Sequence, residues 1–172
     1  MRDARGFTLI ELLIVLAIVG VLAATAMGLY RSARVRGGEA SAVAALQAIN
    51  QAQFAFAQAC GNQRYAPTLA SLVTPMPSTG QGFLSPDLGA DPLLKGGYTY
   101  VMGGTVVTDT GLTCTGLNPV VTYQVTADPE RPGQSGIRFF GTNTDRVIYE
   151  DEATFTANMP ETGAPGHGRE TK

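Results

Sequence analysis

The strongest pattern in the chain is an apolar run from Phe7 to Leu29. As a helix it extends about 35 Å at about 1.5 Å per residue, enough to cross the roughly 30 Å hydrocarbon core of a bilayer. Glu11 is its only strongly polar member, because Thr8 and Thr25 can bond to their own helix. A carboxylate inside a membrane span costs about 2–3 kcal/mol unless a partner is supplied. The pattern therefore predicts a membrane-spanning helix over residues 7–30 and a role for Glu11.

Helical character continues over residues 31–60. Residues 40–59 contain no proline or glycine and are rich in Ala and Gln, which favour helices. Apolar side chains recur there at helical spacing, which predicts a core-facing side, whereas three polar positions are expected to point outward. The apolar positions are Val43, Leu46, Ile49 and Phe56, and the polar ones are Gln47, Asn50 and Gln58. Soft points are expected at Gly20, Gly28 and Gly37-Gly38, and a left-handed cap at Gly61 should end the helix.

The remaining pattern predicts an α+β fold. Residues 61–97 form a connecting helix and loop, in which Thr68 is the expected cap and Pro75 the stop. Residues 98–159 alternate like an antiparallel sheet of four or five strands. The expected strands are residues 98–102, 105–108, 120–127, 136–140 and 146–149, with Gly103-Gly104 as a hairpin turn. Residues 160–172 are rich in Gly, Pro and charge, so we expect a disordered tail.

Composition narrows the classes of function. The formal net charge is −2 and charged residues make up only 15%, so there is no basic surplus for binding nucleic acid through its phosphates. The one histidine, His167, lies in the expected tail between two glycines. No catalytic triad or phosphate-binding loop is recognisable, so we expect no enzymatic activity, no bound cofactor and no nucleic-acid partner.

The string Gly6-Phe7-Thr8-Leu9-Ile10-Glu11 resembles the processing site of type IV prepilins and type II secretion pseudopilins. The resemblance implies a leader peptide of residues 1–6, cleavage between Gly6 and Phe7 by prepilin peptidase, and N-methylation of Phe7. It also implies a pilin-like fold, in which a long N-terminal helix packs on a small antiparallel sheet. Glu11 would then pair with the new ammonium of Phe7 during assembly, within one subunit or between neighbours.

The same resemblance implies a location and partners. The protein would sit in the bacterial inner membrane as a single-pass protein with its domain outside, before entering a periplasmic or extracellular filament. Its partners would be other copies of itself, minor pilins and an inner-membrane assembly platform. Counting arginines gives a weak opposite orientation, since Arg2 and Arg5 precede the span and Arg31, Arg34 and Arg36 follow it. We follow the motif, because the margin of the count is thin.

Two features bear on the kind of filament. Asp91-Pro92 followed by Gly97-Tyr98-Thr99-Tyr100 is similar to the start of the sheet in major pseudopilins, which favours a pseudopilin over a type IV pilin for adhesion, motility or DNA uptake. Related pseudopilins hold calcium in their C-terminal loop. Asp145 and Asp151, with Glu150 and Glu152 nearby, are the weak candidates for this, and a solvated acidic strand end is the favoured alternative.

A conventional signal peptide is the second interpretation. Arg2 and Arg5 would be its basic start, residues 12–24 its apolar stretch, and Ala24-Thr25-Ala26 its cleavage site. The mature protein would then begin near Met27 as a soluble secreted binding domain. Glu11 and the length of the apolar run argue against it.

The chain has two cysteines, Cys60 and Cys114, whose spacing fits no metal or redox motif. In an oxidising compartment an even count favours one disulfide, which would tie the end of the long helix to the sheet. Two separately buried thiols are the alternative.

Overall fold

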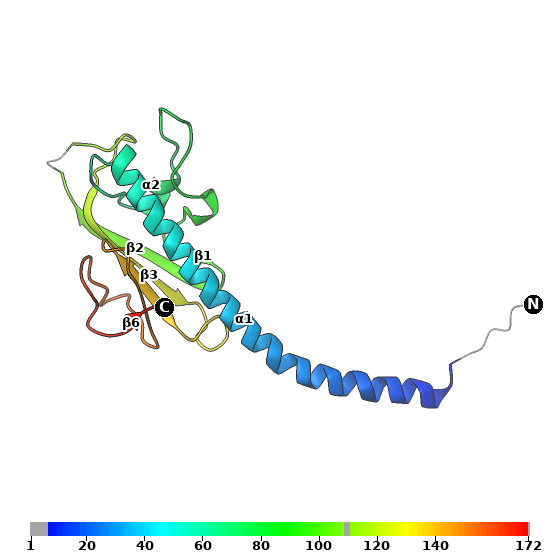
Figure 1. Ribbon diagram of the computed structural model, residues 1–172. Helices are drawn as coiled ribbons and strands as arrows, with labels where there is room; N and C mark the ends of the chain where they lie inside the picture. The colour runs from blue at the N-terminus through cyan, green and yellow to red at the C-terminus, as the bar shows by residue number, and fades with distance from the viewer. Residues whose placement is uncertain (1–6, 109–110, 172) are drawn as a thin grey trace, which may run out of the picture. The chain divides into compact units, whose positions relative to one another are not determined.

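The structure is a computed structural model that describes residues 7–108 and 111–171. The chain divides into two compact units, Met1–Arg34 and Val35–Lys172, and each is described by itself. One helix, α1 (Leu9–Ala59), runs through the first unit and into the second (Figure 1). It continues without interruption through Gly20, Gly28 and the Gly37-Gly38 pair, so the expected soft points do not end it.

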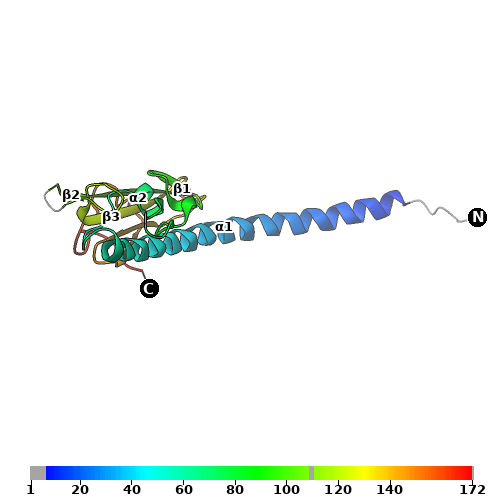
Figure 2. The same cartoon turned by 90° about the horizontal axis from the view of Figure 1, so that it is seen from above.

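In the second unit, the C-terminal part of α1 lies along one face of the sheet (Figure 2). Leu46, Ile49 and Phe56 are fully buried there, as their helical spacing predicts. Asn50 departs from the prediction, since it points inward and is buried. Its amide donates to Thr142 Oγ1 (2.8 Å) and accepts from the Tyr123 hydroxyl (3.0 Å), and these bonds compensate for its loss of water.

The end of α1 corrects a second expectation. The left-handed residues are Asn62 (φ 51°) and Gln63 (φ 67°), and not Gly61. Gly61 is needed for space instead, because a Cβ at this position would overlap the carbonyl oxygen of Arg64. A short helix, α2 (Leu69–Val73), follows and is capped by the Thr68 side chain, as predicted; a 3₁₀ turn, η1 (Pro86–Leu88), comes next.

The sheet has six antiparallel strands in the order β1-β2-β3-β4-β5-β6. They are β1 (Leu93–Lys95), β2 (Tyr98–Val106), β3 (Val120–Pro129), β4 (Phe139–Asn143), β5 (Ile148–Asp151) and β6 (Arg169–Glu170). The α+β, pilin-like architecture predicted from the sequence is confirmed. The expected four or five strands are too few, because both edge strands are short and their sequences carry no alternating pattern.

Gly103-Gly104 is not a hairpin turn. Both residues lie inside β2 and pair with Gln124 and Tyr123 of β3. A Cβ on Gly104 would overlap the carbonyl oxygen of Thr122, so this glycine allows two strands to approach closely. The predicted strands at 98–102 and 105–108 therefore form one strand, which ends at Val106. The strands expected at 136–140 and 146–149 begin later, at Phe139 and Ile148.

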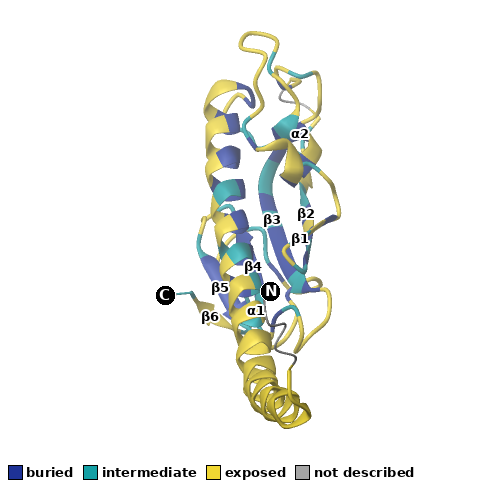
Figure 3. Cartoon of the chain, turned by 90° about the vertical axis from the view of Figure 1, so that its right-hand side faces the viewer, coloured by how far each residue is buried: buried dark blue, intermediate teal, exposed yellow. Residues whose placement is uncertain are grey.

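The prediction of a disordered tail is also wrong for residues 160–171. This segment folds back so that Arg169 and Glu170 pair with β5 as strand β6. Phe155 and Met159, just before it, are buried beside Gly141 of β4, on the sheet face opposite α1. Gly, Pro and charged residues suggested disorder, but the segment is held by particular contacts rather than by its own propensity. Figure 3 shows the buried side of α1 turned toward the sheet.

Candidate functional site

The start of α1 is held by a reciprocal contact between Thr8 and Glu11. The Glu11 N–H donates to Thr8 Oγ1 (3.3 Å), and the Thr8 N–H approaches Glu11 Oε2 (3.5 Å). This is the capping-box arrangement, in which a threonine before the helix and a glutamate three residues later satisfy each other's backbone. The spacing Thr-x-x-Glu is visible in the sequence and is the signal for this cap, whereas the role predicted above for Glu11 is only electrostatic.

The first unit exposes an unusual apolar surface. All of its described side chains are exposed, and large ones such as Phe7 (82% exposed) and Leu9 (76% exposed) recur along the helix. A soluble monomer rarely presents so large an apolar surface to water. α1 is the one helix in the described part of the chain that is long and apolar enough to cross a membrane, judged by length and composition. Residues 9–29 thus require a lipid or protein environment.

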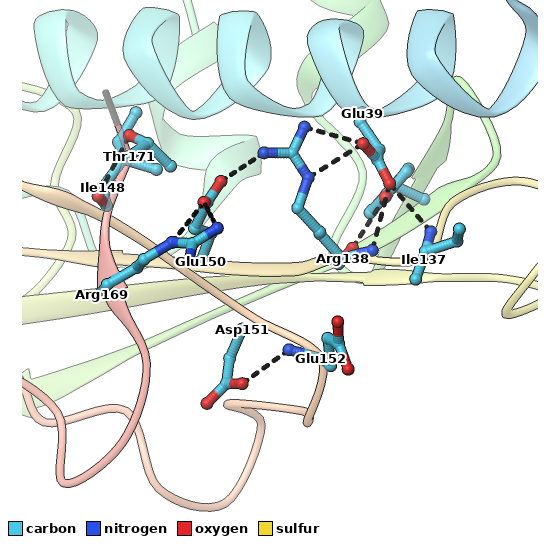
Figure 4. Close-up of polar contacts among 10 residues, drawn as sticks. Glu39, Ile137, Arg138, Ile148, Glu150, Asp151, Glu152, Arg169 and Thr171 are labelled. Atoms are coloured by element: carbon cyan, nitrogen blue, oxygen red, sulfur yellow. Dashed lines mark hydrogen bonds and ion pairs between the residues drawn. The ribbon is translucent and has the colours of Figure 1, made fainter.

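An ion-pair network with two buried carboxylates ties α1 to the sheet in the second unit (Figure 4). Glu39 of α1 accepts from the Arg138 guanidinium (2.7 and 2.9 Å) and from the backbone N–H groups of Ile137 (3.0 Å) and Arg138 (3.2 Å). Arg138 also pairs with Glu150 of β5, which in turn receives Arg169 of β6 (2.8 Å). The network joins a helix, a loop and two strands that are distant in the sequence.

Electrostatics favour the ionised form of Glu39. Burial alone would raise its pKa, but the backbone N–H groups of Ile137 and Arg138 and the guanidinium of Arg138 outweigh burial and hold the pKa below its usual value. Glu39 in turn raises the pKa of Arg138. Neither residue was predicted from the sequence to have a role. The available signal was a lone glutamate at the start of a twenty-residue helical stretch without any charge.

The acidic residues considered for calcium have other partners. Asp145 Oδ2 accepts from the N–H of Gly163, and Asp151 Oδ2 lies 2.6 Å from His167 Nδ1. Asp145 precedes β5 and Asp151 ends it, so the two carboxylates lie at opposite ends of a strand and cannot share an ion. Glu150 is engaged by two arginines. Within the described residues, no group of three or more His, Cys, Asp or Glu side chains is arranged to hold a metal.

His167 is held in place, contrary to the sequence expectation. Its ring stacks on Phe155 with 4.9 Å between centroids and 3° between planes. The hydrogen bond from His167 lowers the pKa of Asp151. The contact with Asp151 ties the C-terminal segment to the end of β5, and the stack on Phe155 holds that segment together, so this histidine has a structural role.

Cys60 and Cys114 are joined by a disulfide, the pairing favoured by the sequence. The N–H of Cys114 also donates to the carbonyl oxygen of Cys60 (2.9 Å). The bond connects the residue after α1 with the loop between β2 and β3.

Of the residues expected to take part in processing and assembly, the structure describes Phe7 and Glu11. Gly6 and the rest of the expected leader, residues 1–6, lie outside the described residues. Phe7 and Glu11 are described, and both are exposed at the start of the apolar helix. Ala24-Thr25-Ala26, the site expected for conventional cleavage, lies inside continuous helix.

Residues 1–27 match the family model of the prokaryotic N-terminal methylation motif, which is the motif of type IV pilin-like prepilins. No curated protein matches the chain. The family match covers the start of the chain and does not extend to the sheet domain.

Proposed function

We propose that this chain, which is type IV pilin-like by its N-terminal motif, is a pseudopilin of a type II secretion system, a structural subunit rather than an enzyme. The observation that carries the proposal is the methylation motif joined to a fully exposed apolar helix and a separately packed α+β unit. A motif of this class implies processing by prepilin peptidase and assembly into a filament. Minor pilins and an inner-membrane platform are the further partners we propose.

Assembly follows from the chemistry of the N-terminus. Cleavage after Gly6 leaves an ammonium on Phe7, and methylation keeps its positive charge. Glu11 lies one helical turn away and is the only carboxylate in the apolar segment. Leaving the membrane for a filament core keeps residues 9–29 out of water, and the pairing of Phe7 with Glu11 gains strength where water is excluded. Before assembly, the same helix anchors the protein in the inner membrane with its domain outside.

Three observations support a pseudopilin over a pilin for DNA uptake, adhesion or motility. Asp91-Pro92 leads directly into β1, and Tyr98 and Tyr100 of the following motif are fully buried in the core. Those two tyrosines lie at the beginning of β2 and pack in the core there, in line with the resemblance. The net charge of −2 also gives the chain no overall surplus of positive charge for binding DNA.

Intact-mass analysis of the N-terminus tests the proposal. We expect the chain, co-expressed with a prepilin peptidase, to lose residues 1–6 and to gain one methyl group on Phe7. Gly6→Leu should abolish both changes, while Gly20→Ala, a glycine with no neighbour within 4 Å, should be processed normally. A mature start at Met27 would refute the proposal in favour of a secreted soluble domain.

The phenotype of a gene deletion distinguishes a pseudopilin from a pilin. Loss of secretion with retained twitching or DNA uptake after deletion of the gene supports a pseudopilin, whereas the reverse pattern supports a pilin.

For calcium, the geometry of Asp145 and Asp151 does not fit a shared ion. We therefore propose that calcium leaves the melting temperature unchanged, and a rise with saturating calcium would overturn this point.

A further inference from the structure

From Ala40 to Ala59, the solvent-facing side of α1 lacks charge. Residues 40–59 contain no Asp, Glu, Lys or Arg, although one side of the helix is open to solvent along this stretch. A helix face that meets water normally carries charged side chains. The exposed positions on it include Ala40, Ala44, Gln47, Gln51, Phe54 and Gln58. This composition suits contact with another protein surface.

The face is also hollowed. A hollow of about 580 Å³ lies against Ala40, Val43 and Ala44, and a second of about 370 Å³ lies against Gln51 and Phe54. Both include Gln47, so the two hollows adjoin each other along α1, and together we call them the α1 groove. Its remaining walls come from Arg138, Arg146, Glu150, Arg169 and Thr171.

The far wall of the α1 groove is cationic. Arg146 lies over the Phe54 ring, 4.7 Å from its centroid, and forms no ion pair with any described residue. The Arg169 side chain is 79% exposed although it pairs with Glu150. Together with Arg138, three arginines face two carboxylates, those of Glu39 and Glu150. A ligand for this groove should be apolar in its centre and carry carboxylates.

A segment with those properties lies at the opposite edge of the sheet. The strand order places β1 at one edge and β6 at the other. Residues 87–94, before and within β1, expose Asp87, Asp91 and Leu94, the last at 60%. Ala90 and Pro92 are exposed between them, and Lys95 forms an ion pair with Asp87. We call these residues the β1 edge segment.

Two other occupants from the same chain fit less well. A twofold contact between two α1 grooves would bring Arg146 and Arg169 of each copy against like charges. The apolar half of a neighbouring α1 carries a single carboxylate, Glu11, near its end and therefore does not complement the cationic wall. The β1 edge segment combines exposed apolar side chains with carboxylates.

We propose that the α1 groove of one copy receives the β1 edge segment of a second copy. Because the two surfaces lie on opposite edges of the same unit, the contact is heterologous. Repeating such a contact builds a ring or an open helical array, and the proposed filament requires the open array. The inference rests on the proposed filament function and adds the lateral contact by which the folded domains are joined. Asp91 approaches the arginine wall, and Leu94 lies against the small side chains of the helix.

Cysteine pairs test the contact in assembled filaments. A full-length chain carrying both Ala44→Cys and Leu94→Cys should give a ladder of oxidised multimers, because each copy links to a neighbour on either side. The matched pair Ala44→Cys and Leu117→Cys, which uses another exposed leucine (40% exposed), should give no ladder. Filaments that form without a ladder in the first pair would overturn the inference. A dimer from Ala44→Cys alone would assign the groove to a twofold contact and would also overturn it.

Charge reversal supplies an independent readout. Arg146→Glu and Asp91→Arg should each lower the filament yield by at least about tenfold, because each juxtaposes like charges. The double variant, with the charges exchanged, should restore most of the yield. Arg131→Glu, a reversal of an exposed arginine outside the groove, should have no effect. If the unmodified chain forms no filament, the proposed function fails, whereas filaments unaffected by either reversal refute only the groove contact.

Discussion

At the scale of single residues, Glu39 is the buried carboxylate by which α1 binds the loop before β4, through Ile137 and Arg138. Replacing it by Gln removes the charge that faces Arg138 and leaves that guanidinium with Glu150 alone. Because Arg138 is 40% exposed, we expect a loss of about 1–3 kcal/mol, less than for a fully buried pair. Urea unfolding of the full chain in detergent measures it. Glu130→Gln, at a loose 3.9 Å pair with Arg131, should be neutral, and equal losses in both variants would contradict the assignment.

The same residue predicts a dependence on pH. The folded state holds the pKa of Glu39 below its unfolded value of about 4.3. Its stabilisation is therefore fully present above the unfolded pKa and is lost as the pH falls through the folded pKa. The difference in unfolding free energy between the wild type and Glu39→Gln should be constant from pH 7 to about 5.5 and shrink below about 4. A difference that grows on acidification would exclude this mechanism.

Gly38 contributes space rather than flexibility. A Cβ at this position would overlap the carbonyl oxygen of Ser135, whereas Gly37 has nothing within 4 Å. Gly38→Ala should destabilise the second unit by about 1–3 kcal/mol, while Gly37→Ala should be neutral or stabilise by up to about 1 kcal/mol. Thermal unfolding of the two variants compares them directly. Equal behaviour would mean that α1 can move away from the loop at little cost.

These residues also show what the sequence could not predict. A glycine pair in a helix indicates softness, but only the loop carrying Ser135 tells which glycine is required for packing. Asparagine is usually exposed, yet Asn50 is buried because its partners Thr142 and Tyr123 come from strands more than 70 residues away. Local pattern carries no information on such partners. By contrast, the cap at Thr68 is local, and it was predicted correctly.

At the scale of elements, residues 152–171 act as a strap over the outer face of β4 and β5. Phe155 is fully buried and contacts Gly141, Gly168 and the His167 ring. Phe155→Ala should cost about 3–5 kcal/mol, the usual range for a buried phenylalanine. Limited proteolysis should then cut the strap early, while Leu112→Ala, at a side chain that is 63% exposed, should leave it resistant. A strap that is cut equally fast in the wild type would restore the expectation of a disordered tail.

The disulfide makes a second prediction at this scale. Cys60 and Cys114 are 54 positions apart, and cross-linking a loop of that size stabilises by about 4 kcal/mol in the chain-entropy model. Full-length chain treated with reductant should therefore unfold at a lower temperature, and alkylation without reductant should add no mass. The double variant Cys60→Ser with Cys114→Ser supplies the control, because its melting temperature should not respond to reductant.

The elements differ in how far the sequence revealed them. The length of α1 and its buried side follow from apolar periodicity, which extends over many turns and averages out local exceptions. β1 and β6 have three and two residues and were missed, since strands this short are set by pairing with β2 and β5. The strap was missed for the same reason, because Arg169 and Thr171 are held by Glu150 and Ile148.

At the scale of the whole molecule, Glu11 has one observed contact and one proposed role, and a pair of variants separates them. As a capping-box residue it supports the start of α1 together with Thr8. The proposed role is to pair its charge with the ammonium of processed Phe7. Glu11→Gln keeps a side chain able to cap but removes the charge, whereas Thr8→Ala removes the cap and keeps the charge. If assembly depends on the charge, Glu11→Gln should lower filament yield by at least about tenfold, the factor that corresponds to about 1.4 kcal/mol. Thr8→Ala should then assemble nearly normally, since an exposed cap contributes only about 1 kcal/mol.

Removal of residues 1–6 should proceed in both variants, and this can be measured by intact mass on the same samples. The opposite ranking, with Thr8→Ala impaired and Glu11→Gln normal, would show that Glu11 acts in the folded helix and not between an ammonium and a carboxylate in the filament.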